Sequence, residues 1–180
     1  DGFGAGSLVS VCAIDANTPP SGYTLDNTDC NDNNVTIYQS ASLYIDFDGD
    51  GYDNGTATVC YGMLVPSGYS LTTNGSDCLD SNPILHDVFP FYTDNDGDGF
   101  GAGSLVSVCA IDAITPPAGY TLDNTDCNDT NASMHESFDF YADTDLDGYG
   151  FGSLMSVCAV NATTPPSGYS MNNTDCSPTD

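Results

Sequence analysis

Apolar and polar residues alternate along the chain only in short runs, which glycine, proline, asparagine and aspartate separate. The run 104–111 is rich in β-branched residues and predicts a strand, and 120–122 predicts a second, shorter one. The aromatic segment 89–92 predicts a strand that leads into an acidic loop, whereas 115–119 predicts a turn. No segment keeps a helical period for long, and only 130–136 is expected to form one or two helical turns. The pattern therefore predicts a mostly β and irregular fold of short strands and loops.

This order of elements recurs at a period of about 49 residues, which is typical of a linear tandem array. Tyr44, Tyr92 and Tyr141 mark the starts of successive repeats. The array comprises 1–43, which lacks its beginning, then 44–91 and 92–140, and finally 141–180, which lacks its end. We therefore expect a segment of a longer chain, in which aromatic residues at the boundaries pack between neighbouring repeats.

Charge narrows the possible partners. The 180 residues include 26 acidic side chains and no lysine or arginine, so the formal net charge is −26. Such self-repulsion destabilises a compact state, and a bound divalent cation is the simplest external source of positive charge. The same composition excludes nucleic acid as a partner and disfavours an anionic membrane surface. No apolar run reaches the ~18 residues that a membrane span requires.

Eight cysteines occur in pairs, and 17 residues separate the members of every pair. A repeat of this size seldom builds a sufficient core alone, and small secreted domains compensate with disulfides or metals. The regular spacing predicts one disulfide within each repeat and an oxidising, extracellular compartment. Zinc is the alternative, but two Cys and at most one His per repeat fall short of a structural zinc site. The expected pairs are Cys12–Cys30, Cys60–Cys78, Cys109–Cys127 and Cys158–Cys176.

Each complete repeat opens with an Asp-x-Asp-x-Asp-Gly motif. Alternating carboxylates wrap a hard cation, and the glycine permits the sharp turn. The motif resembles the start of an EF-hand, but the twelfth position from Asp94 is Leu105 instead of Glu, so other ligands must come from elsewhere. The candidate ligands in these loops are Asp46, Asp48, Asp50, Asp94, Asp96, Asp98, Asp143, Asp145 and Asp147, with Asp1 as the remnant of the first loop.

A second acidic motif surrounds the second cysteine of each repeat and is the best source of the missing ligands. An oxygen-rich donor set suits calcium better than softer metals. The alternative is that these aspartates only occupy turns, where Asp is favoured in any case. In the last repeat the motif is interrupted by Pro178, which predicts the weakest site there. Its candidate ligands are Asp29, Asp32, Asp77, Asp80, Asp126, Asp129 and Asp175.

The motif order in 92–129 resembles a known family. Tyr-x-Asp-x-Asp-Gly-Asp-Gly-Phe-Gly, then Cys, Pro-Ala-Gly-Tyr and Asn-Thr-Asp-Cys-Asn-Asp, is similar to the tandem metal-binding motif repeats of large secreted and surface proteins of bacteria. A looser likeness exists to thrombospondin type 3 calcium repeats. The resemblance covers essentially the whole chain and implies metal binding and an extracellular structural or adhesive role. The chain departs from the family after Asp129, where further cysteines are missing, so it implies no extra cross-link.

Two histidines and the sequons add secondary hypotheses. His86 and His135 occupy equivalent positions in their repeats, and together with Met134 they would allow a copper site. The first repeat has Tyr38 at this position, which favours the simpler interpretation that the histidines only pack on a turn. Sequons and Thr-Pro-Pro segments suggest a glycan coat, although about half of the sequons would arise by chance in so Asn- and Thr-rich a chain. The candidate glycan sites are Asn34, Asn54, Asn74, Asn128, Asn131, Asn161, Asn172, Thr18, Thr115 and Thr164.

These patterns predict an extracellular, calcium-binding structural repeat protein that forms a rod, stalk or filament at a microbial surface. Its expected partners are further copies or further repeats of the same array, together with glycans. The alternatives are a metal-acquisition protein, for example for copper, and an adhesin for carbohydrate or other surfaces. An enzyme is not expected, because no nucleophile–base pair recurs and no Lys or Arg is present to hold an oxyanion.

Overall fold

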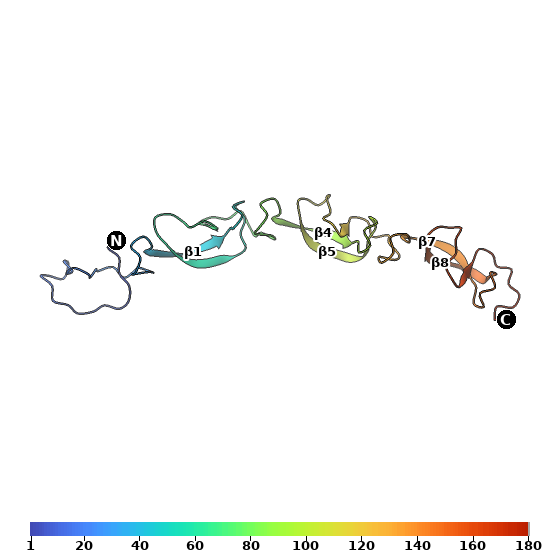
Figure 1. Ribbon diagram of the computed structural model, residues 1–180, viewed down its shortest axis with the longest axis horizontal. Helices are drawn as coiled ribbons and strands as arrows, with labels where there is room; N and C mark the ends of the chain where they lie inside the picture. The colour runs from blue at the N-terminus through green and yellow to red at the C-terminus, as the bar shows by residue number, and fades with distance from the viewer. Residues whose placement is uncertain (180) are drawn as a thin grey trace. The chain divides into compact units, whose positions relative to one another are not determined.

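The computed structural model describes residues 1–179, and all of their regular secondary structure is β-strand (Figure 1). The strands form three-stranded sheets in the orders β2-β1-β3, β5-β4-β6 and β8-β7-β9. The central strands are β1 (Gln39–Ile45), β4 (Asp87–Thr93) and β7 (Glu136–Ala142). The long outer strands are β2 (Thr56–Tyr61), β5 (Ala102–Ala110) and β8 (Phe151–Ala159), and the short ones are β3 (Tyr69–Ser70), β6 (Tyr120–Thr121) and β9 (Tyr169–Ser170).

This arrangement confirms a mostly β fold built from tandem units of about 49 residues. The strands expected at 89–92, 104–111 and 120–122 correspond to β4, β5 and β6. Each of the boundaries 43/44, 91/92 and 140/141 falls inside a central strand. The structural unit therefore starts a few residues earlier than the tyrosines that mark the sequence period.

The helical turns expected at 130–136 are absent from the described part of the chain. Two successive tight turns stand there instead, closed by hydrogen bonds from Asn131 N–H to Asn128 O and from Met134 N–H to Asn131 O, at 2.9 and 2.8 Å. Asn131 Oδ1 also accepts the N–H of Ser133, at 3.3 Å. Such side-chain bonds to the backbone favour turns over helix, and Glu136 already belongs to β7.

The core of each unit is very small. Leu43, Phe91 and Phe140, the fifth residues of the central strands, are the large side chains that are completely buried within residues 1–179. Ala110 and Ala159, at the ends of β5 and β8, are also buried. Burying one large apolar side chain contributes about 2–3 kcal/mol, which is far below the entropy lost by ordering a unit of this length. The core alone therefore does not stabilise a unit of this length, and the disulfides must contribute.

The disulfides differ from the pairs expected from the spacing. Cys30 bonds Cys60 and Cys127 bonds Cys158, with Cα–Cα distances of 5.7 and 5.6 Å. Each of these bonds joins the second cysteine of one repeat to the first cysteine of the next, so the expected pairing within repeats is wrong.

Antiparallel pairing explains the difference, because Ser40 lies opposite Cys60 in β1–β2 and Ser137 lies opposite Cys158 in β7–β8. The preceding turn delivers the second cysteine to this end of the sheet. Cys78 and Cys109 are also disulfide-bonded. Cys12 and Cys176 are free and exposed, contrary to expectation, because the observed bonds join each second cysteine to the first cysteine of the following repeat.

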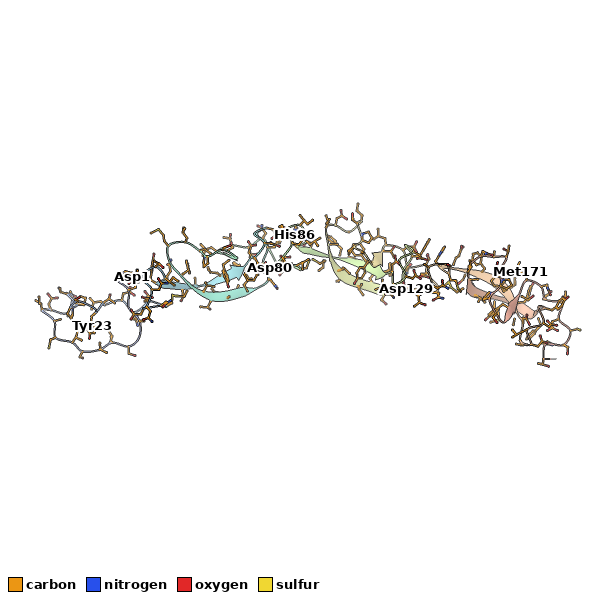
Figure 2. All side chains as sticks on the ribbon, in the orientation of Figure 1. Asp1, Tyr23, Asp80, His86, Asp129 and Met171 are labelled. Atoms are coloured by element: carbon orange, nitrogen blue, oxygen red, sulfur yellow. A yellow bond between two sulfur atoms is a disulfide. The ribbon has the colours of Figure 1, made fainter. Side chains whose placement is uncertain are left out.

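Residues 1–87 and 88–180 form two compact units. Within the first, residues 1–37 contain no strand, and Figure 1 draws them as a long blue loop without arrows. Figure 2 labels Tyr23 in this loop. The described part of the chain contains no helix long and apolar enough to cross a membrane.

Candidate metal sites

The first aspartate of each acidic loop holds the loop in shape. Asp94 Oδ1 accepts the N–H of Gly97 at 2.7 Å, and its Oδ2 accepts the N–H of Gly99 at 3.1 Å. Asp143 makes the same two bonds to Leu146 and Gly148, at 2.8 and 3.0 Å. Both carboxylates are buried. Because both oxygens bind backbone N–H groups, the role of this aspartate is to shape the loop.

The second and third aspartates divide their oxygens differently. In the third repeat, Asp96 Oδ1 accepts the N–H of Asp98 at 3.3 Å, and Asp98 Oδ1 accepts the N–H of Phe100 at 2.9 Å. The Oδ2 atoms of both residues are buried and have no hydrogen-bond partner within residues 1–179. Asp48 and Asp50 repeat this arrangement in the second repeat. A buried carboxylate oxygen without a partner is costly, so this geometry calls for a cation.

The second acidic motif supplies a further oxygen of the same kind. Asp77, Asp126 and Asp175 each accept a backbone N–H through Oδ1 at 2.7 Å, and their Oδ2 atoms are buried without a partner in the described chain. In the second repeat, carboxylate oxygens of Asp48, Asp77 and Asp80 all lie within 4.8 Å of one another. The two acidic motifs therefore meet at one place there, as the sequence suggested.

Three other groups bring the aspartates of a single loop equally close. They are Asp46–Asp48–Asp50, Asp94–Asp96–Asp98 and Asp143–Asp145–Asp147, again with ligand atoms within 4.8 Å. A hard cation with six to eight oxygen ligands at ~2.4 Å fits such a group of carboxylates. The donors therefore suit calcium.

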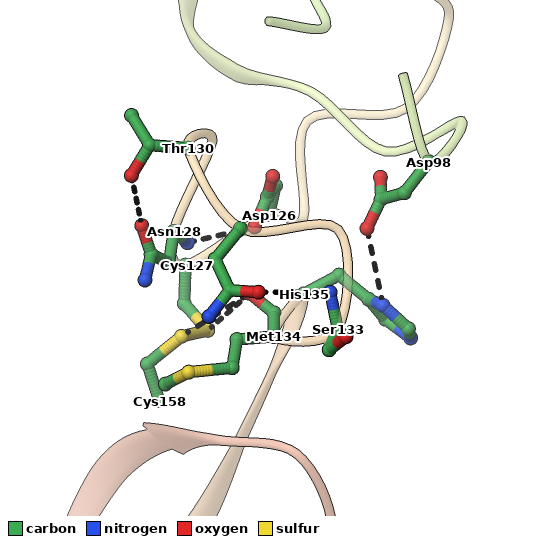
Figure 3. The surroundings of a disulfide bond; sticks show 10 residues. Asp98, Asp126, Cys127, Asn128, Thr130, Ser133, Met134, His135 and Cys158 are labelled. Atoms are coloured by element: carbon green, nitrogen blue, oxygen red, sulfur yellow. Dashed lines mark hydrogen bonds and ion pairs between the residues drawn. A yellow bond between two sulfur atoms is a disulfide. The ribbon is translucent and has the colours of Figure 1, made fainter. Parts of the chain in front are cut away.

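Histidine is the component of the site that the sequence interpretation undervalued. The His135 ring stacks on Phe100 with ring centroids 4.2 Å apart, and His86 stacks on Tyr52 at 4.0 Å. These contacts point His135 Nδ1 toward Asp98 Oδ2, at 3.3 Å (Figure 3), and the matching distance from His86 to Asp50 is 3.5 Å. Both Nδ1 atoms are buried and lack a hydrogen-bond partner in the described residues. Each histidine therefore packs on a ring and also faces the acidic cluster.

Burial and the neighbouring carboxylates act together on the pKa of Asp96. Burial raises the pKa of Asp96 above its ordinary value of 3.8, and the neighbouring Asp98 and Asp126 carboxylates raise it further. With no lysine or arginine in the chain, only a cation or a proton can relieve this repulsion. Asp126 is adjacent to Cys127 in sequence, so the Cys127–Cys158 disulfide restrains the turn that carries this ligand (Figure 3).

The last residue of the second motif varies between repeats. Asp80 Oδ1 accepts the N–H of Phe47 at 2.7 Å while belonging to the cluster. Asp129 is hydrogen-bonded through both oxygens to Asn95, to its N–H at 2.7 Å and to its side-chain amide at 2.5 Å. In the fourth repeat the carbonyl of Pro178 takes this place and accepts a bond from Thr144 Oγ1. The residue at this position therefore accepts a hydrogen bond from the start of the acidic loop in each of these repeats, even where that residue is a proline.

The first repeat holds only part of a site. Asp29 is buried and accepts the N–H of Asn31 at 2.7 Å, and Asp1 accepts the N–H of Phe3 at 3.2 Å. Asp1 and Asp32 are exposed, and none of the three belongs to a metal-like cluster among residues 1–179. The ring of Phe3 stacks on Tyr38, at 4.8 Å, where the later repeats have a histidine.

Several sequons have a structural use of their own. The side-chain oxygens of Asn34, Asn161 and Asn172 each accept a bond from the threonine hydroxyl two residues later, and Asn128 does the same toward Thr130. Asn-x-Thr is therefore also a turn motif here, which explains part of its abundance. Asn54, Asn74, Asn131 and Asn161 are exposed, and so are Thr18, Thr115 and Thr164.

No family model, curated protein or solved structure matches this chain. The resemblance to bacterial metal-binding repeats therefore depends on the motifs themselves, and the site geometry stands independently of it.

Proposed function

We propose that this chain is a calcium-binding structural repeat protein of the extracellular space. The observation that carries the proposal is the recurrence of buried carboxylate oxygens that lack a hydrogen-bond partner within residues 1–179, at the same three aspartate positions in the second and third repeats. Bound calcium neutralises these oxygens, offsets part of the net charge of −26 and stabilises units whose core is one large side chain.

The disulfides and the repeat period support a mechanical role. Within each compact unit, a disulfide joins one repeat to the next, so pulling on the chain cannot separate these neighbours by unfolding alone. Three disulfides also fit an oxidising, extracellular compartment. Together with the absence of linkers, these features suit a rod, stalk or filament at a microbial surface, and the exposed sequons suit a glycan coat.

A transition-metal site is the second candidate function, and the buried Nδ1 atoms of His86 and His135 favour it. Three carboxylates with one imidazole form a donor set that copper(II) or zinc also accepts. Under this alternative the protein acquires or stores metal. Calcium is preferred as the resident ion because carboxylate oxygens outnumber the single imidazole that faces each of the clusters of repeats two and three.

Titration calorimetry on the full chain, freed of metal with a chelator, tests the proposal. We expect a measurable heat of calcium binding at the sites of repeats two and three. Asp98→Asn should weaken calcium affinity at one site at least about tenfold, or ~1.4 kcal/mol. Asp139→Asn removes an exposed aspartate of β7 outside every cluster and is the matched control. Equal titrations for both variants would contradict the calcium proposal.

The same titration with copper(II) decides between the candidates. Under the calcium proposal, His135→Gln leaves calcium binding within about threefold of the parent chain, since calcium prefers oxygen. Copper binding tighter than calcium binding, and lost in His135→Gln, would favour metal acquisition instead.

A further inference from the structure

The second and third repeats carry aspartates at the same five positions but build different groups from them. In the second repeat, carboxylate oxygens gather in two groups of three, each with its ligand atoms within 4.8 Å of one another. In the third repeat one such group is present among residues 1–179. The five aspartates of the second repeat are Asp46, Asp48, Asp50, Asp77 and Asp80, and their counterparts in the third are Asp94, Asp96, Asp98, Asp126 and Asp129.

The two groups of the second repeat share one residue. The loop site consists of Asp46, Asp48 and Asp50, and the turn site consists of Asp48, Asp77 and Asp80. Each contains a carboxylate that is more than nine-tenths buried, since the Asp50 side chain is 7% exposed and Asp77 is 8% exposed. The Oδ2 atoms of Asp48, Asp50 and Asp77 are buried and have no hydrogen-bond partner in the described chain. Each group therefore contains a buried oxygen that requires a cation.

The last residue of the second acidic motif accounts for the difference between the repeats. Asp129 gives both of its oxygens to Asn95, one to the backbone N–H at 2.7 Å and one to the side-chain amide at 2.5 Å. Asp80 accepts the backbone N–H of Phe47 at 2.7 Å, and the phenyl ring has no second donor to offer. The ring instead lies edge to face against Tyr69, with centroids 6.1 Å apart. Asp80 therefore keeps an oxygen for a cation, whereas Asp129 does not.

The first aspartate of the loop differs in the same direction. Asp94 accepts two backbone N–H groups of its loop. Within residues 1–179, Asp46 accepts one, that of Gly49 at 2.7 Å. Gly51, which corresponds to the second donor, is held through its carbonyl by the N–H of Asn74, at 2.8 Å. The remaining oxygen of Asp46 is therefore available as a ligand.

The turn of the third repeat contributes a single carboxylate. Asp126 keeps a buried Oδ2 that has no partner in the described residues, and its carboxylate repels that of Asp96. Because Asp129 is occupied by Asn95, Asp126 has no second acidic ligand beside it on the turn. One cation shared between the loop and Asp126 therefore satisfies the third repeat.

Charge favours two cations in the second repeat. Its five carboxylates have no lysine or arginine to neutralise them. One divalent cation offsets two of these charges, and two cations offset four of them. A carboxylate between two cations also reduces their mutual repulsion, and Asp48 belongs to both groups.

We propose that the second repeat holds two calcium ions, one in the loop site and one in the turn site, bridged by Asp48. The third repeat, in which Asn95 occupies Asp129, holds one. This arrangement rests on the proposed calcium-binding function and adds a second ion to it. The number of ions is set by the residue after the first aspartate of the loop, which is Phe47 in one repeat and Asn95 in the other.

Calcium counting on matched variants tests this arrangement. Equilibrium dialysis of the full chain against radioactive calcium, at a concentration that just saturates the parent chain, gives the ions bound per chain. We expect Asp80→Asn to lose one ion and the equivalent Asp129→Asn to lose none. Each variant removes one charge at the same position of the motif and keeps an oxygen that accepts the backbone N–H. Non-specific binding to the acidic chain therefore changes equally in both.

Substitution of the shared ligand tests the bridge. Asp48→Asn should lose two ions, because both sites contain this residue. The equivalent Asp96→Asn should lose one, because the third repeat has a single site. A loss of only one ion in Asp48→Asn would overturn the bridged arrangement.

Phe47→Asn changes the residue that sets the number of ions without removing a carboxylate. The new amide should bind the second oxygen of Asp80, as Asn95 binds Asp129, and one ion should be lost. Phe47→Leu introduces no donor and should keep the parental number. Phe47 is 66% exposed, so both variants should fold as the parent chain does. Equal ion counts for the two variants would contradict the proposal.

The outcomes for the parent chain separate this proposal from the calcium proposal. If the parent chain binds calcium and Asp80→Asn loses no ion, the second repeat has a single site, and the second ion alone is excluded. If the parent chain binds no calcium, the calcium-binding function fails and the second ion fails with it.

Discussion

At the scale of residues, each aspartate of an acidic loop has a distinct task. In the third loop, Asp94 accepts backbone N–H groups through both oxygens, whereas Asp96 and Asp98 each give one oxygen to the backbone and leave the other buried. The positions of these residues could be predicted from the sequence, because the motif itself requires them. Which oxygen of each carboxylate accepts a backbone N–H could not be predicted. It depends on the fold of the loop and on the turn of the second acidic motif, about thirty residues further along the chain.

The fourth loop contains a backbone strain that its counterparts avoid. Leu146 has φ of 67°, whereas Gly97 and Gly49 stand at this position in the other loops with φ of 78° and 80°. A left-handed conformation costs a residue with a Cβ about 1–2 kcal/mol. We expect Leu146→Gly to stabilise the chain by about 1 kcal/mol and the reciprocal Gly97→Leu to destabilise it by a similar amount. Thermal unfolding in excess calcium measures both, and changes of the same sign would refute the strain argument.

At the scale of elements, the central strand organises each unit. It pairs with both outer strands, carries the one large core residue and leads directly into the acidic loop. The strands were predictable from their β-branched and aromatic residues. The turns at 130–136 were not predictable, because the same residues could form one helical segment or two consecutive turns. The two turns are each closed by an i to i+3 hydrogen bond to the carbonyl of Asn128 or Asn131.

The disulfide between Cys127 and Cys158 should matter more than its exposed position suggests. It closes a loop with a sequence separation of 31 and restrains the turn of Asp126. The chain-entropy relation assigns a loop of this size about 3.7 kcal/mol. We expect Cys127→Ser with Cys158→Ser to lower the free energy of unfolding by about 2–4 kcal/mol and to weaken calcium binding at the third repeat.

The control for this prediction is Cys176→Ser, which removes a free thiol and should change neither quantity. Peptide mapping of the non-reduced parent chain should recover the fragment joining Cys127 to Cys158. Recovery of a fragment joining Cys109 to Cys127 would restore the pairing within repeats.

At the scale of the whole molecule, self-repulsion sets the response to pH. Asp96, whose pKa is raised, is less easily ionised in the folded state, so without metal its protonation stabilises the fold as the pH falls toward 3.8. Hydrogen bonds from Thr125 lower the pKa of Asp123, which acts in the opposite direction, since its stabilisation is lost on acidification.

Calcium requires ionised ligands, so protons compete with it. We expect the rise in melting temperature produced by calcium to shrink steadily between about pH 6 and about pH 4, around the ordinary pKa of a carboxyl group. Asp96→Asn should reduce both the rise and its pH dependence. A calcium effect that is constant across this range would argue against carboxylate ligation.

The sequence by itself determined the repeat period, the order of strands and turns, the positions of the acidic loops and the large negative net charge. All of these follow from local residue patterns and composition. Only the tertiary structure decided which cysteines pair, since a disulfide needs Cα atoms about 5.6 Å apart and equal spacing along the chain does not show which ends of a sheet meet. It also decided that His86 and His135 face the carboxylates, because ring stacking on Tyr52 and Phe100 orients them.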